Sequence, residues 1–394
     1  YADYTFQHKF GQGSTLSTGI TAIQNVVNSE LFGNHNSQNY AAYSQLEYHK
    51  NKLDLSAGVR LEYFEMDGNE PDSQFQLPGK DSLFVPVYPV LRTGLHYALK
   101  PFTHLRASFG QGIRYPSVAE RFTQTSVGAL NIFPNPELRP EIGWAGEIGI
   151  KQGFKIGNWK AMIDAALFLN QYSNMMEFSF IYYNPITQQP LNPLNPSPED
   201  IEFLTSGQYN IGDWVGFQAQ NAEKARISGL DLSFNSAGQL GNVELVSLIG
   251  YTYMNPISLN SNPQYVANFS DTTTNMLKYR FKHLAKADVE ATYQKISFGA
   301  SMRYNSFMRN IDRVFEDDLD PSPTSEVYIL PGLKAYRQQF NGGNLVFDAR
   351  FAYLLKEQYR VSFIVNNLFN AEVTSRPGDI QAPRLFMLQL QAKF

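Results

Sequence analysis

The sequence predicts an all-β fold, specifically a transmembrane antiparallel β-barrel, and three observations lead to this class. Charged residues make up only 17% of the 394 residues, and aromatic residues reach 14%, whereas an average soluble domain is about 25% charged. No segment approaches the roughly 18 consecutive apolar residues of a membrane-spanning helix. Apolar and polar residues instead alternate one by one, which puts them on opposite faces of extended strands. A barrel between lipid and a polar lumen needs such strands. A large soluble all-β protein, such as a propeller, is the alternative.

The alternation recurs along the chain, and each occurrence predicts one strand. In residues 53–63, Leu53 and Leu55 begin an apolar face, whereas Asp54 and Arg60 lie on the other face. An Arg or Lys on the lipid side costs roughly 2–4 kcal/mol at the bilayer midplane, so this segregation favours a membrane wall. Strands of about 9–12 residues fit a tilted crossing. We expect about fifteen strands, near residues 3–10, 14–26, 38–49, 53–63, 87–99, 105–114, 144–151, 160–172, 226–234, 243–253, 285–293, 296–304, 345–353, 359–367 and 383–394.

The last predicted strand carries the strongest alternation. Its apolar face holds Phe386, Leu388, Leu390, Ala392 and Phe394. Met387, Gln389, Gln391 and Lys393 fall on its other face. A strand with one face toward lipid and one toward a polar lumen accounts for this pattern. The terminal aromatic residue also resembles the C-terminal signal that the outer-membrane barrel assembly machinery recognises, so we take the five apolar residues as an assembly signal.

The predicted connections alternate between short and long. Short turns are expected near residues 11–14, 50–52, 100–102, 153–158, 235–242, 294–295 and 356–358. Long connections are expected near residues 27–37, 65–86, 115–142, 174–221, 255–279, 306–343 and 369–382. Bacterial outer-membrane barrels have short periplasmic turns and long extracellular loops.

The predicted number of strands bears on whether the chain forms a whole barrel. Single-chain bacterial barrels have an even number of strands, and fifteen is odd. Either one strand escapes the pattern, or the chain is the C-terminal part of a larger barrel, which we prefer. No signal peptide pattern begins at Tyr1, so we expect a start after processing or inside a longer protein.

Several motifs together identify a family. Residues 108–122, from Ser108 to Phe122, are followed by Asn-Pro-Glu-Leu-Arg-Pro-Glu at 135–141; further motifs lie at 57–63, 221–232, 366–372 and 383–394. In order and spacing these motifs resemble TonB-dependent outer-membrane receptors, most closely those of the Bacteroidetes type. The resemblance implies a 22-stranded barrel around a plug domain. Residues 1–394 would then be the C-terminal part of the barrel, with the plug and about seven first strands absent from this chain.

The resemblance also implies a function. Such a receptor takes up a scarce, bulky solute, by default a ferric siderophore or a cobalamin-like ligand. An oligosaccharide or peptide importer paired with a surface lipoprotein is one alternative, and a non-transporting structural subunit of an outer-membrane complex is another. The expected location is the bacterial outer membrane. The implied partners are membrane lipids, the barrel assembly machinery, and TonB–ExbB–ExbD through a plug that this chain lacks.

Other classes are excluded or disfavoured by the residues. The net charge of −4 and the lack of a basic block argue against nucleic acid,. No Gly-x-Ser-x-Gly motif or phosphate-binding loop occurs,, so we expect no enzyme and no cofactor. Residues 117–134 contain no histidine, which disfavours haem because haem importers of this family tend to place one there. The acidic stretch of Asp312, Glu316, Asp317, Asp318 and Asp320 could hold calcium, but a solvated loop is the preferred interpretation and we predict no metal site.

Aromatic and Arg side chains at the outer strand ends are the candidate ligand contacts, because such residues carry much of the recognition energy of binding sites. These candidates are Arg114, Tyr115, Arg121, Phe122, Tyr172, Tyr182, Tyr183, Trp214, Phe217 and Tyr253. The alternative for each of them is the aromatic girdle that barrels place at the membrane interfaces.

Overall fold

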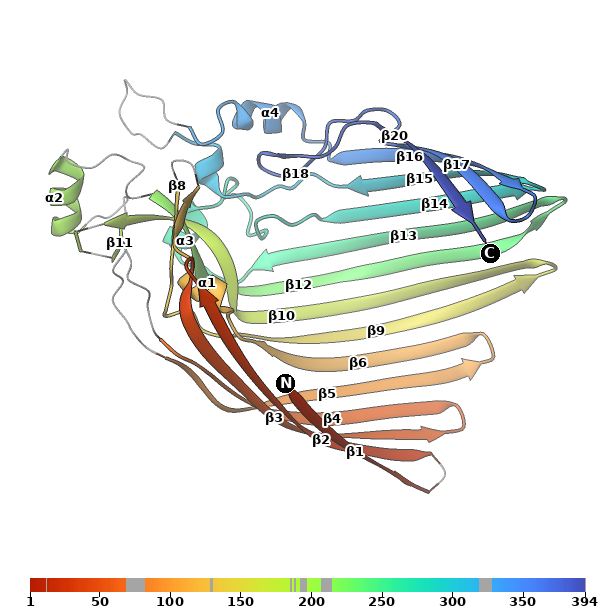
Figure 1. Ribbon diagram of the computed structural model, residues 1–394, viewed down its shortest axis with the longest axis horizontal. Coiled ribbons are helices and arrows are strands. Elements are labelled where there is room, and N and C mark those ends of the chain that lie inside the picture. The colour runs from red at the N-terminus through yellow and green to blue at the C-terminus, as the bar shows by residue number, and fades with distance from the viewer. Residues whose placement is uncertain are drawn as a thin grey trace.

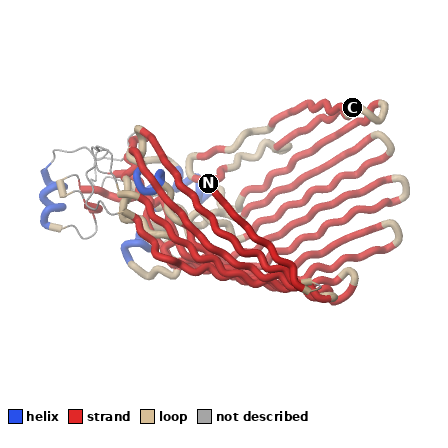
Figure 2. The backbone as a smooth tube through the Cα atoms, turned by 60° about the horizontal axis from the view of Figure 1, so that its bottom comes forward, coloured by secondary structure: helices blue, strands red, loops and turns tan. Residues whose placement is uncertain are grey.

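A single curved antiparallel sheet makes up most of the molecule (Figure 1). The structure is a computed structural model, and it describes all residues except 12, 69–81, 128–129, 185, 188, 192–196, 207–214, 319–327 and 394. The sheet has 18 strands, of which β7, β8 and β11 are three- or four-residue strands beside the wall. The remaining fifteen strands form a wall that is shaped like a trough (Figure 2).

The wall strands follow one another in chain order. They are β1 (Ala2–Phe10), β2 (Ser14–Ser29), β3 (Gly33–Lys50), β4 (Leu53–Met66), β5 (Leu83–Lys100), β6 (Thr103–Arg114), β9 (Glu141–Ile156), β10 (Trp159–Asn184), β12 (Val215–Leu240), β13 (Val243–Ser258), β14 (His283–Tyr293), β15 (Ile296–Asn305), β16 (Asn344–Leu355), β17 (Tyr359–Asn366) and β20 (Leu385–Ala392). Each pairs antiparallel with the next wall strand, and among the described residues β1 and β20 have one neighbour each.

Short elements gather at one end of the wall. They are α1 (Val118–Phe122), β7 (Thr125–Val127), β8 (Leu130–Phe133), β11 (Gln189–Leu191), α2 (Pro198–Ser206), α3 (Pro263–Ala267), the 3₁₀ helix η2 (Arg313–Phe315), α4 (Leu333–Gln339), β18 (Thr374–Arg376) and β19 (Asp379–Ile380). In the part of the chain that the structure describes, no helix has the length and apolarity to cross a membrane.

The fold confirms the predicted all-β class and the count of about fifteen strands, with every predicted strand present. Two expectations were wrong. The strands run from 8 to 26 residues rather than about 9–12, because β10 and β12 stay paired far beyond a membrane crossing, up to Tyr182 and Val215. The long connection expected near 27–37 is a turn over residues 30–32, because the β2–β3 pairing continues to Ser29 and Gly33.

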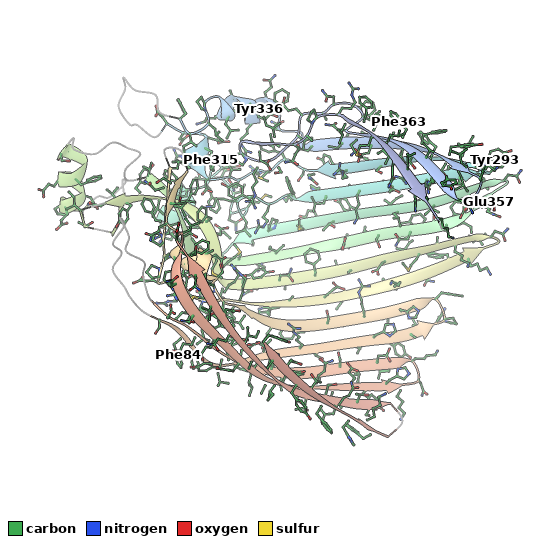
Figure 3. All side chains as sticks on the ribbon, in the orientation of Figure 1. Phe84, Tyr293, Phe315, Tyr336, Glu357 and Phe363 are labelled. Carbon is green, nitrogen blue, oxygen red and sulfur yellow. The ribbon has the colours of Figure 1, made fainter. Side chains whose placement is uncertain are left out.

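The two ends of the wall differ as predicted. In Figure 3, Tyr293 and Glu357 mark the end with short turns, and Phe315 and Tyr336 mark the end with long connections. Several short turns hold a residue with positive φ, for example Asn51 at 57° and Gly241 at 62°. Such residues give the tight turns whose twist matches the flanking strands. We refer to the two ends as the turn end and the loop end.

The register carries the alternation from strand to strand, because directly paired residues lie on the same side of a sheet. One row on the apolar side joins Leu388, Phe363, Phe351, Phe298 and Ala291. The neighbouring row on the polar side joins Gln389, Ser362, Ala352, Ser297 and Thr292. The polar side lines a hollow of about 910 Å³ and another of about 710 Å³, so it faces the inside of the trough and the apolar side faces lipid.

Candidate functional site

The loop end is packed like the interior of a soluble protein, and several predicted ligand residues belong to that packing. Arg121 and Phe122 are each 1% exposed, and Tyr183 is 2% exposed. The Arg121 guanidinium donates to the Pro136 carbonyl and lies 4.9 Å above the Phe122 ring. Burial lowers the pKa of Arg121 to about 10. Side chains this buried hold the connections together and present little surface to a solute.

A second part of the loop end is an aromatic cluster that contains two further candidates. The Phe217 ring stacks on Phe178 at 5.5 Å and on Phe315 at 5.8 Å, and meets Phe180 edge-on at 5.4 Å. Tyr182 packs edge-on against Phe180 at 5.3 Å. This cluster joins the ends of β10 and β12 to η2, and Phe178 keeps 49% of its surface exposed.

The remaining candidates are dispersed. Tyr253 pairs with Leu230, which pairs with Leu167 on the lipid side, so Tyr253 occupies a girdle position. Tyr172 pairs with Gly143 on the inner side.

At the end of β6, Arg114 donates to Glu120 at 2.7 Å and lies 3.6 Å from Glu141. Tyr115 stacks on Phe64 at 4.0 Å, and burial raises its pKa. Trp214 lies outside the described residues. The structure therefore does not bring the ten candidates into one pocket, and their role in binding stays a prediction.

The acidic stretch near residue 312 forms ion pairs. Asp312 lies 2.6 Å from Lys278, and Glu316 lies 2.5 Å from Arg337. Asp317 contacts Arg313 and Lys334, whereas Asp320 lies outside the described residues. Within the described ranges, no three His, Cys, Asp or Glu side chains gather in a way that could hold a metal ion.

The closing strand has the predicted facing. On the lipid side Phe386, Leu388, Leu390 and Ala392 pair with Val365, Phe363, Val361 and Tyr359 respectively. Phe394 lies outside the described residues. The recognition of this strand by the barrel assembly machinery stays a prediction.

A further candidate site lies on the inner side of β12–β17, where sequence reasoning had placed no site. A cavity of about 910 Å³ opens there. Its floor is made of two adjacent rows of paired residues. The first row is Ser233, Gly250, Lys286, Arg303 and Val346, and the second is Asp231, Thr252, Leu284, Asn305 and Asn344.

The segment that carries β18 and β19 covers one side of this cavity. Residues 373–375 and 381–383 contribute to the lining, together with Leu385. Asn344 on β16 donates to the Thr374 carbonyl at 3.1 Å, which ties the segment to the wall. We call this segment, residues 367–384, the cover segment. A large concavity with a few convergent polar groups is the usual form of a ligand site.

Two arginines elsewhere on the inner wall are each paired with two carboxylates. Arg350 donates to both oxygens of Asp288, at 2.7 and 2.8 Å, and to Glu290 at 2.8 Å. Arg106 makes the same kind of bridge to Glu147 and Asp164, at 2.7 and 2.6 Å. These pairs cross two or three strands, so only the register could reveal them. The lining of the cavity could likewise be recognised only from the register, because each lining residue taken alone occupies an ordinary polar position of an alternating strand.

Strands with an apolar outer side, a charged inner side, short turns at one end and long connections at the other define an outer-membrane β-barrel protein. The chain belongs to the TonB-dependent receptor family, since residues 1–368 match the family model described as "TonB dependent receptor-like, beta-barrel". None of the curated proteins matches the sequence.

Solved structures share the fold. The hemophore receptor HasR of Serratia marcescens is 14% identical, with a TM-score of 0.62, over all of this chain and 58% of that chain. The copper transporter OprC is 16% identical, with a TM-score of 0.61, over all of this chain and 56% of that chain. The ferric-catecholate import receptor Fiu of E. coli K12 is 16% identical, with a TM-score of 0.59, over all of this chain and 54% of that chain. The chain thus spans a little over half the length of these structures.

Family membership confirms several predictions at once. The family consists of outer-membrane transporters that are not enzymes, which agrees with the predicted location and with the prediction of no enzymatic activity. The substrate is not determined, because matching structures include a haem system, a copper transporter and a siderophore receptor.

Proposed function

We propose that this chain is the transport wall of a receptor that imports a scarce, bulky solute, a ferric siderophore or a cobalamin-like compound. The observation that carries the proposal is the polar inner side of the wall, with its cavity of about 910 Å³ on β12–β17. Drug-sized ligands occupy pockets of roughly 300–1,000 Å³, so the cavity has room for a large part of such a solute. The titles of Fiu, as a ferric-catecholate import receptor, and of FpvA, bound to ferric pyoverdine, support this substrate class by fold alone.

In this proposal residues 1–394 supply the last fifteen strands of a 22-stranded barrel. The partial coverage of the matched structures, between 47% and 58% of their chains, supports this view. Energy would arrive from TonB–ExbB–ExbD through a plug outside this chain. Lipids would contact the apolar side, and the barrel assembly machinery would recognise Phe386, Leu388, Leu390, Ala392 and Phe394.

An importer of oligosaccharides or peptides, paired with a surface lipoprotein, is the second candidate. The aromatic cluster around Phe217 favours it, because Phe178 offers a half-exposed ring at the loop end. Exposed rings stack on the apolar faces of sugars and peptide side chains.

Growth of a strain that lacks the gene tests the proposal. Each culture receives one source of iron, of cobalamin or of glycan at limiting concentration. Loss of growth on one ferric siderophore or on cobalamin, restored by the intact gene, is the expected result. Loss on a glycan alone would favour the second candidate. Normal growth on every source, together with defects in other outer-membrane complexes, would instead support a structural subunit.

A further inference from the structure

A buried lysine and a buried aspartate meet at the loop end. The Lys278 ammonium lies 2.6 Å from Oδ1 of Asp312, and the two side chains are 1% and 2% exposed. The ring centroids of Tyr265 and Phe269 lie 5.8 and 5.9 Å from the ammonium nitrogen, so aromatic surface covers it. The cost of removing both charges from water can exceed the attraction between them. A reaction that removes both charges would relieve this cost.

Hydrogen bonds hold together the two segments that carry these side chains. The backbone N–H of Tyr279 donates to the Asn310 carbonyl at 2.8 Å, and the Asn310 side-chain amide donates to the Met276 carbonyl at 2.8 Å. Lys278 and Asp312 therefore extend from two segments in contact, although 34 residues separate them in the chain. Two groups held in this way react as if their concentrations were far above those reached in solution.

Two further side chains contact the pair with groups that can move or donate a proton. Glu177 lies 3.7 Å from the Lys278 ammonium and accepts from the Tyr265 hydroxyl at 3.0 Å. The Tyr279 hydroxyl donates to Oδ2 of Asp312. Burial and the nearby Asp312 carboxylate raise the pKa of Tyr279, so its phenol keeps the proton that it donates.

The backbone of Tyr279 is strained in the position that makes this contact. Its φ is 57°, in the left-handed region that residues with a side chain seldom adopt,. Such a conformation costs free energy and persists only where the surrounding structure fixes it, which happens most often at functional sites. The strain directs the phenol toward the carboxyl group of Asp312 while the backbone N–H of Tyr279 stays bonded to Asn310.

We propose that Lys278 and Asp312 form a modification site, at which the folded protein joins the two side chains by an amide bond. A proton passes from the Lys278 ammonium to the Asp312 carboxylate, which leaves a neutral amine and a neutral carboxyl group. The nitrogen lone pair attacks Cγ of Asp312 and the Nζ–Cγ bond forms, while Tyr279 donates to the oxygen that becomes negative. Glu177 then takes a proton from the nitrogen and gives it to the hydroxyl group on Cγ. The Cγ–O bond breaks and one water molecule leaves, so the two opposite charges are gone and Glu177 is unchanged.

The amide ties two connections of the loop end together. Lys278 lies between β13 and β14, in the connection that carries α3, and Asp312 lies between β15 and β16, beside η2. A crosslink of this kind lowers the entropy of the unfolded chain because it closes a loop there. The loop end then opens less readily, whatever solute the receptor transports.

Peptide mass spectrometry of the full-length protein, purified from outer membranes and digested with trypsin, tests the site. Trypsin does not cleave after a lysine whose amine forms an amide, so residues 227–280 should remain joined to residues 310–313. We expect this branched peptide, lighter than the sum of its two parts by one water molecule, to account for most of both segments. Recovery of residues 227–278 and 310–313 only as separate peptides would overturn the proposal and leave a buried ion pair.

Variants separate the reaction from the fold. Lys278→Arg and Asp312→Ala each remove one reacting group, and both should abolish the branched peptide. Glu177→Gln keeps both reacting groups, and we expect it to slow the linking by about 100-fold, a typical contribution of general acid–base catalysis. The rate is measured by folding urea-solubilised protein into detergent and sampling the branched peptide over time. An unchanged rate in folded Glu177→Gln protein would contradict the assigned mechanism.

Lys334 and Asp317 provide a matched control within the same digest. Their charged groups lie 3.1 Å apart, as close as an ion pair requires, but the side chains are 57% and 29% exposed. We expect this pair to stay unlinked, because water solvates both charges and keeps the amine protonated. A branched peptide at both pairs would overturn the site, since proximity alone would then produce the amide.

Discussion

The loop end and the membrane wall are built from one continuous set of strands, but their apolar side chains are covered differently. Other parts of the protein cover them at the loop end, and lipid covers them in the wall. Among the described residues, all four clusters of buried apolar residues lie at the loop end, around Phe122, Tyr183, Leu277 and Val215. The apolar residues of the wall, such as Ile148 and Leu390, remain 59% and 74% exposed. Outside the membrane a strand must find another protein surface to cover its apolar side, whereas in the membrane lipid covers it.

The charges follow the same division. At the loop end Lys278 is 1% exposed, lies 2.6 Å from Asp312 and 3.7 Å from Glu177, and faces the rings of Tyr265 and Phe269. In the wall Arg350 keeps 28% of its side chain exposed beside Asp288. Removing one partner of an ion pair is therefore expected to destabilise the loop end more than the wall, because an unpaired charge costs the most free energy where water is excluded.

The largest expected effect is the loss of an aromatic ring from the loop end. Phe122→Ala should lower the local free energy of opening by about 3–5 kcal/mol, because the ring is buried against Val118, Phe64 and a stacked His35,. Hydrogen exchange of residues 115–138 measures the change.

Phe363→Ala on β17 is the comparison variant. Its ring is 47% exposed on the lipid side, so we expect a much smaller change in exchange of β17. An equal decrease in the local free energy of opening for both variants would mean that the loop end and the wall are packed alike.

The next effect concerns the buried ion pair. Lys278→Met keeps much of the aliphatic part of the side chain but removes the ammonium group that pairs with Asp312. The unpaired carboxylate should destabilise the connections around α3 and η2 by about 3 kcal/mol. Limited proteolysis of intact cells detects the loosened segment. Lys295→Met, in an exposed turn of the wall, should leave the cleavage pattern unchanged, and a pattern altered by both would contradict the distinction.

A third prediction separates the two sides of the wall. Leu388→Arg should hinder folding by about 2–4 kcal/mol, the range for Arg on a lipid face near the bilayer midplane, because Leu388 lies on the apolar side of β20,. Gln389→Arg, one residue away on the inner side, should be tolerated. Migration of unheated samples in gel electrophoresis reports the folded fraction, and equal tolerance at both positions would refute the assignment of sides.

The smallest effect is acid loosening of α1. Burial opposes ionisation of Glu120, but the hydrogen bonds from Ser117 and Arg114 outweigh it and hold the pKa of Glu120 below its ordinary value of 4.5. Because the folded pKa is the lower one, this carboxylate contributes stability above about pH 4.5 that is lost as the pH falls through the folded pKa. The capping box that Glu120 forms with Ser117 stabilises α1 by about 1 kcal/mol.

Hydrogen exchange of residues 118–123 should therefore accelerate below pH 4.5 relative to β17, after correction for the intrinsic rates. Ser117→Ala should bring the same acceleration to neutral pH. An unchanged protection of α1 in both cases would show that the helix is held by Phe122 alone.

The candidate site was far less predictable than the fold. The alternation in residues 285–293, 296–304 and 345–353 places Lys286, Arg303 and Asp348 on the polar side, but it does not show that Lys286 and Arg303 are paired across neighbouring strands. Conversely, Arg121 and Tyr183 have the residue types of a binding surface and are almost fully buried. Residue type indicates what a side chain can bind, whereas burial depends on what the rest of the chain places over it.

By itself the sequence determined the number of wall strands, the side of the wall on which each residue lies, and most of the short and long connections, because these depend on neighbours within one strand or turn. Only the tertiary structure decided the contacts between strands, such as Arg350 with Asp288, 62 residues away, and the adjacent cations beneath the cover segment. A two-residue change of register would keep every side chain on its own side of the wall, yet would bring different charges together, whereas a one-residue change would turn the polar side toward lipid. The site therefore follows from the register, and the fold follows from the alternation.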